Sequence, residues 1–143
     1  MFEKFNFTDR QVQKYYQSAW RDLKIVFDSA IPEVIFRFCY DALLKLAIAV
    51  CARENLRVKA RQGHHIELIE FLARFLKDKE IITFGNEMRT KRNWDLYGGG
   101  TLISQKEAME YQKWVEEVFE KADKYFKKNQ ETFLDKFKKI DSL

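Results

Sequence analysis

The chain has 143 residues, of which 46% are hydrophobic and 34% charged, a balance that excludes a disordered protein and is typical of one globular domain. A chain of this length buries about two-thirds of the surface that it exposes when unfolded, so neither a disulfide nor a metal is needed to stabilise it. The net charge of +4 is weak evidence for a nucleic-acid partner, because lysine-rich helical surfaces are common.

The first expected helix begins just after Thr8. Thr8 and Gln11 have the spacing of a capping box, and Phe7 and Val12 have that of a hydrophobic staple. Apolar side chains then recur every three or four residues, as on one face of a helix: Val12, Tyr15, Tyr16, Ala19, Leu23, Val26 and Phe27. The pattern predicts an amphipathic helix that ends before Pro32.

The second expected helix covers about residues 32–53 and is apolar nearly all round. A helix of this kind belongs in the middle of a bundle or at an oligomer interface. Its longest apolar run, residues 42–52, is interrupted by Lys45 and is too short to cross a bilayer. We therefore expect no membrane association.

Cys39 and Cys51 lie twelve residues apart on this expected helix, which separates them by about 18 Å along its axis. That distance excludes a disulfide between them. Two reduced, buried thiols and an N-terminus without the long apolar core of a signal peptide predict a soluble, cytoplasmic protein.

Three further helices follow a basic connection at residues 54–63. The third begins at Gly63-His64-His65, the fourth covers about residues 80–97 and stops at three glycines, and the fifth opens with a capping box at Ser104 and Glu107. The apolar pattern breaks after Lys127. The sequence thus predicts an all-α, antiparallel up-and-down bundle of four to five helices over residues 1–128, with 129–143 as a short docked helix or a frayed end.

Two basic clusters are candidates for anion binding. One lies in the connection after the second helix and the other near the end of the fourth: Arg53, Arg57, Lys59 and Arg61, and Arg89, Lys91 and Arg92. His64 and His65 are adjacent, so they would point about 100° apart on a helix, and no other ligand accompanies them at the spacing of a zinc site. We expect no metal; one imidazole caps or packs the helix, or contacts a ligand beside the basic connection.

The segment 89–98 differs from an ordinary polar helix end. Arg89, Asn93 and Tyr97 are four residues apart and share one side of a helix, with Arg92 beside them. A guanidinium binds phosphate bidentately, and an amide and a phenol can donate further hydrogen bonds. A polar helix end with Tyr97 packed on the bundle explains the same spacing.

Arg92 is followed by the polar residue Asn93 and then, near the helix end, by Tyr97. This order, an arginine, a polar residue and then His or Tyr, resembles the signature of the HEPN (higher eukaryotes and prokaryotes nucleotide-binding) domain family. Residues 36–47 are similar to the family's aromatic, alanine-rich helix. Residues 63–69 are similar to the His-containing helix start of many members. The resemblance covers about residues 8–126, with the helices in the family's order.

The resemblance implies a homodimer with two arginine-centred sites in a shared cleft. Many members are metal-independent ribonucleases, and others work with a minimal nucleotidyltransferase in toxin–antitoxin modules. Carried over, the catalytic residues of an enzyme would be Arg92, Asn93 and Tyr97, and no cofactor is implied. With the basic clusters, the candidate phosphate-binding or nucleic-acid-binding residues are Arg57, Arg61, His64, Arg89, Lys91 and Arg92.

Tyr97 departs from the ribonuclease signature, which has His at this position. Imidazole, with a pKa near 6.5, can act as base and acid at neutral pH, whereas about one phenol in a thousand is ionised there. His64 or His65 could replace the missing imidazole only where the fold brings it to Arg92.

The leading hypothesis is therefore a HEPN-like domain that binds RNA or a nucleotide, working with a minimal nucleotidyltransferase in a toxin–antitoxin type of module. An active ribonuclease toxin is one alternative. A helical protein-interaction module without a nucleic-acid role is another.

Overall fold

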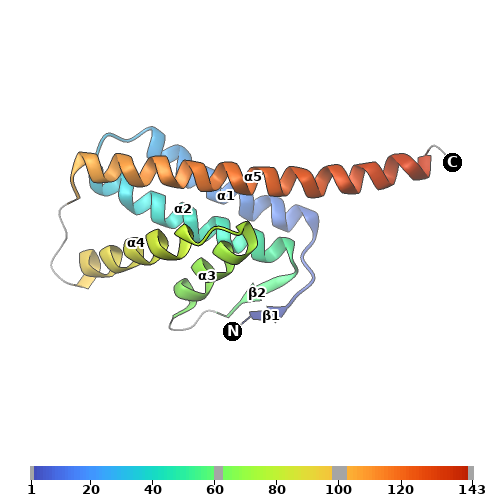
Figure 1. Cartoon of the computed structure of the whole chain (residues 1–143), viewed down its shortest axis with the longest axis horizontal. Helices are drawn as coiled ribbons and strands as arrows, with labels where there is room; N and C mark the ends of the chain where they lie inside the picture. Colours follow the sequence, from blue (N-terminus) through green and yellow to red (C-terminus); the bar gives the residue numbers. More distant parts are fainter. Residues whose placement is uncertain (1, 60–62, 98–102, 142–143) are drawn as a thin grey trace.

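The computed structural model describes the backbone of residues 2–59, 63–97 and 103–141 and the side chains of residues 2–59, 63–93 and 103–127. It confirms the all-α antiparallel bundle, with one small sheet added (Figure 1). The elements in chain order are β1 (Phe2–Lys4), α1 (Asp9–Phe27), α2 (Pro32–Arg53), β2 (Leu56–Val58), α3 (His64–Leu76), α4 (Glu80–Tyr97) and α5 (Gln105–Asp141).

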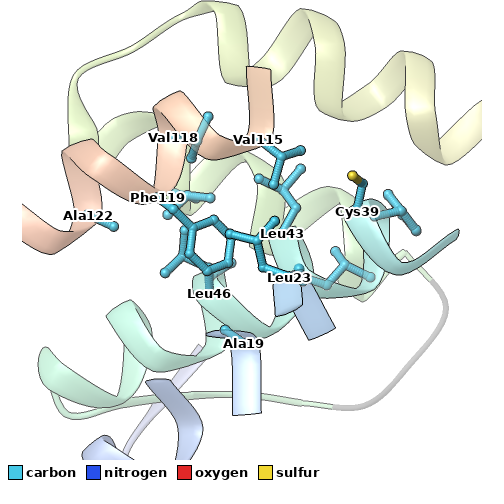
Figure 2. Packing of buried hydrophobic residues seen from close by; sticks show 14 of the residues in the cluster. Ala19, Leu23, Cys39, Leu43, Leu46, Val115, Val118, Phe119 and Ala122 are labelled. Atoms are coloured by element: carbon cyan, nitrogen blue, oxygen red, sulfur yellow. The ribbon is translucent and has the colours of Figure 1, made fainter. Parts of the chain in front are cut away.

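α2 is the central helix, and thirteen of its 22 residues are buried. It packs against α1, α5, α3 and α4. Figure 2 shows Leu43 and Leu46 of α2 clustered with Leu23 of α1 and Phe119 of α5. The apolar circumference of α2 is thus covered by the chain's own helices, so its composition requires no oligomer interface. The homodimer stays a prediction.

One charge lies inside the contact between α1 and α2. Asp22 is only 5% exposed, and Lys45 holds it with an ion pair of 2.8 Å. A buried carboxylate needs such a partner, since its desolvation would otherwise be costly. The pair explains why α2 carries a lysine in its longest apolar run.

Both expected capping residues act as predicted. The Gln11 amide donates to Thr8 Oγ1 at 3.2 Å, and the Thr8 amide donates to Gln11 Oε1 at 2.9 Å. At the start of α5 the Glu107 amide donates to Ser104 Oγ at 3.0 Å. Cys39 and Cys51 are buried and free, as expected. None of the helices in the described part of the chain has the length and apolar character of a membrane span.

Two features differ from the sequence-based expectation. Part of the basic connection pairs antiparallel with the N-terminus as β1–β2, with Phe2 opposite Val58. Strands of three residues are too short to show the alternation that predicts a strand. The second feature is α5, which continues beyond Lys127 as one helix to Asp141 and extends past the other helices (Figure 1).

Gly85 marks a close approach of α4 to α3. A Cβ added there would lie 2.7 Å from Cγ2 of Ile69. Alanine favours a helix over glycine by about 1 kcal/mol, but overpacking a buried contact costs about 1–3 kcal/mol. We expect Gly85→Ala to lower the free energy of unfolding, measured by urea denaturation. Thr83→Ala, at an exposed position of α4, should not lower it; greater stability of Gly85→Ala would contradict the close packing.

Candidate anion-binding site

Polar side chains from three helices converge where α2, α3 and α4 pack together. α2 contributes Tyr40 and Asp41, α3 contributes His65, and α4 contributes Arg89 and Arg92. The Tyr40 hydroxyl contacts His65. The charges of Arg89 and Arg92 lower the pKa values of Tyr40 and His65, and the charge of Arg92 lowers that of Asp41, so both guanidinium groups are within electrostatic range of this contact. We call this set the arginine cluster.

The start of α3 positions the imidazole. Gly63 is the N-cap and has a φ of 85°, in the left-handed region that favours glycine. The chain can therefore turn sharply from the basic connection into α3, which places His64 and His65 in the first turn. The two imidazole rings are 4.4 Å apart between centroids.

His65 is fixed by a buried phenol of α2. Tyr40 is 1% exposed, and its hydroxyl lies 3.1 Å from Nδ1 of His65. Burial raises the pKa of Tyr40 to about 12, more than Arg89 and Arg92 lower it. Tyr40 is therefore a neutral phenol at physiological pH, with one proton that needs an acceptor.

His65 is also neutral at physiological pH. Burial lowers the pKa of His65, and the charges of His64, Arg92 and Arg89 lower it further. We assign the hydroxyl proton of Tyr40 to the bond with Nδ1, because a buried hydroxyl without an acceptor is unfavourable. The remaining proton of the neutral ring is then on Nε2, and His65 is a hydrogen-bond donor there.

Arg92 carries the clearest sign of a ligand. Its Nε and Nη1 atoms are buried, and neither has an acceptor among the described residues. Leaving a buried donor unpaired costs about 1–3 kcal/mol, and more for a charged group. Native structures satisfy most buried polar groups, so an acceptor from outside the described residues, such as a bound water or a ligand, is expected here.

Asp41 moderates the positive charge of the cluster without removing it. Burial raises the pKa of Asp41, and the charge of Arg92 opposes this increase. Two guanidinium groups, one carboxyl and a neutral imidazole leave the arginine cluster with a net positive charge while Asp41 is ionised. The arrangement suits a bound oxyanion such as phosphate, which accepts several hydrogen bonds at once.

The other residues that the sequence suggested are dispersed. Lys91 turns toward α5, where its ammonium is 2.9 Å from Glu107 Oε2. Arg57 lies in β2 and donates from Nε to Glu3 Oε1 at 2.7 Å. Arg57 therefore has a partner within the small sheet, and the two basic clusters are not brought together by a described contact.

Not every suggested residue can be placed. The side chain of Asn93 is exposed on α4. Tyr97 is the last residue of α4, but its side chain lies outside the described residues, as does all of Arg61. His64 lies beside His65 at the edge of the cluster. The prediction that Arg92, Asn93 and Tyr97 form one site stays a prediction.

Sequence reasoning missed Tyr40 and Asp41 as site residues. Tyr40 lies in an apolar helix, where the pattern predicts that an aromatic side chain is a buried core residue. The adjacent histidines were the one signal in the sequence for this site, because an imidazole near Arg92 could take part in ligand binding or catalysis. His65 lies within range of the charge of Arg92, which lowers its pKa.

Within the described residues, no group of three or more His, Cys, Asp or Glu side chains is placed to hold a metal ion. No family model matches the chain, and comparisons with curated proteins and with solved structures also give no match.

The protonation state of His65 can be measured directly. At pH 7 we expect ¹⁵N–¹H correlation spectra to show the neutral ring with its proton on Nε2. Arg92→Gln removes a neighbouring positive charge and should raise the pKa of His65, whereas Arg74→Gln, at the far end of α3, should leave it unchanged. A proton on Nδ1 in the unmodified protein would contradict the assignment.

Proposed function

We propose that the chain is a HEPN-like domain that binds a phosphate group of RNA or of a nucleotide at the arginine cluster. The observation that carries the proposal is the pair of buried donors on Arg92 that lack an acceptor among the described residues. A phosphate oxygen would satisfy them, and Arg89 would add a second charge.

The state of His65 favours binding over catalysis. A general base for RNA cleavage must accept the proton of a 2′-hydroxyl, so it needs an unprotonated nitrogen directed at the ligand. With Nδ1 bonded to Tyr40 and a proton on Nε2, His65 can donate to a phosphate but cannot accept a proton there. The phenol of Tyr97 would be a poor base, because only about one phenol in a thousand is ionised at neutral pH.

The resemblance extends the proposal to partners. A HEPN-like domain of this kind would form a homodimer and work with a minimal nucleotidyltransferase in a toxin–antitoxin type of module. The central position of α2 removes its apolar composition as an argument for the dimer. Light scattering at micromolar concentration distinguishes a dimer from a monomer of 17.2 kDa.

The binding proposal predicts a large effect at Arg92. Removing a charge-assisted hydrogen bond costs about 1.5–3 kcal/mol, so Arg92→Ala should weaken binding of single-stranded RNA about 10- to 150-fold in fluorescence anisotropy. Affinity of the unmodified protein should also fall steeply with added salt. Arg74→Gln, which removes an exposed charge of α3 far from His65, is the matched control. An equal loss of RNA affinity in the two variants would mean that binding depends only on overall positive charge. No measurable affinity at low salt would refute the proposal.

A metal-independent ribonuclease is the second candidate, because His65 supplies an imidazole near Arg92. The two functions are separated by incubating the protein with RNA in excess chelator. We expect the unmodified chain to bind RNA without cutting it. Cleavage that disappears in both Arg92→Ala and His65→Ala would instead establish the enzyme.

A further inference from the structure

A cavity lies between α4 and α5, away from the arginine cluster, with a volume of about 310 Å³. Its walls are partly aromatic: the rings of Phe84 and Trp114 have centroids 5.2 Å apart, and Tyr111 is a third lining residue. Pockets for small molecules typically combine apolar walls with a few polar groups, and this volume is at the small end of their range.

The charged groups of the cavity are mostly acidic. Glu87, Glu107 and Glu110 line it together with one cation, Lys91. Three carboxylates and one ammonium leave a formal charge of −2 at neutral pH, in a protein whose net charge is +4. The cavity therefore favours a positively charged ligand and disfavours the phosphate that the arginine cluster would bind.

Lys91 shows how these walls hold an ammonium group. Its Nζ atom is 2.8 Å from the Tyr111 hydroxyl and 2.9 Å from Glu107 Oε2, and it lies 4.9 Å from the centroid of the Tyr111 ring. Burial disfavours the charge of Lys91, but the hydrogen bonds to Tyr111 and Glu107 outweigh it and raise its pKa above the usual range. The same combination of carboxylate and aromatic ring is available to a second cation.

Phe84, Glu110 and Trp114 are the lining groups that Lys91 does not use in its described contacts. Glu110 has no ion-pair partner among the contacts of the described residues, and it lies one helical turn from Trp114 on α5. An ammonium between them would gain a carboxylate and an aromatic face.

We infer that this cavity binds a small organic cation, namely a short aliphatic diamine. One ammonium would lie between Glu110 and the Trp114 ring. The second would approach Glu87 and Glu107, where it competes with Lys91 and, at Glu87, with the hydrogen bond from the Tyr111 hydroxyl. The two charges of a diamine match the formal charge of the cavity, and its methylene chain suits the aromatic walls. The inference does not depend on phosphate binding at the arginine cluster.

The test is isothermal titration of the full chain with 1,4-diaminobutane at constant ionic strength, with the neutral 1,4-butanediol as the comparison ligand. We expect saturable binding of the diamine only. Glu110→Gln should weaken it about three- to tenfold, because one charge pair is lost. Glu120→Gln, which removes an exposed acid of α5 outside the cavity, should leave it unchanged.

Lys91→Met should change the affinity for the diamine in the opposite direction. The substitution removes the competing ammonium and frees Glu107, so the diamine should bind more tightly than to the unmodified protein. Absence of saturable binding, equal binding of the diol, or equal weakening by Glu110→Gln and Glu120→Gln would overturn the inference. Circular dichroism of each variant confirms that it is folded; because Glu110 is exposed, Glu110→Gln decides the matter even where Lys91→Met fails to fold.

Discussion

The need to cover α2 on every side governs the rest of the structure. A helix that is apolar around its circumference is stable in water only when neighbours bury each face, and at about 25 cal/mol per Å² this burial is a large stabilising term. α1, α5, α3 and α4 all pack against α2. The packing that buries α2 also brings Tyr40 to His65, and it leaves Asp41 within range of the charge of Arg92.

The arginine cluster is the place where the structure departs from ordinary core packing. The buried charge of Asp22 has a local partner in Lys45. Arg92 instead has two buried donors without an acceptor among the described residues, beside an imidazole whose protonation a buried phenol controls. Unpaired donors reduce the stability of the free protein and strengthen binding of a ligand that pairs with them. The proposed phosphate binding rests on this arrangement.

Much of the fold could be predicted because it depends on local chemistry. Thr8 and Ser104 cap helices through contacts within four residues, and the apolar rhythm of α1 follows from the helical repeat alone. The site depends on contacts between distant segments: Tyr40 and His65 are 25 residues apart in the chain. Lys91 and Arg92 are adjacent in sequence but point to different neighbours, since successive residues of a helix differ by about 100°. A run of basic residues in the sequence could not show that Lys91 pairs with α5 while Arg92 has two buried donors without a described acceptor.

The central claim is that the buried donors of Arg92 bind an oxyanion, and the Nε–H resonance of this arginine tests it most directly. Arg92→Lys identifies the resonance by its loss from the ¹H–¹⁵N spectrum of the arginine side chains. Titration with inorganic phosphate should shift it downfield in a saturable manner, as a charge-assisted hydrogen bond forms, while the resonance of exposed Arg74 stays in place. A resonance of Arg92 that does not move, or that moves no more than that of Arg74, would contradict the account.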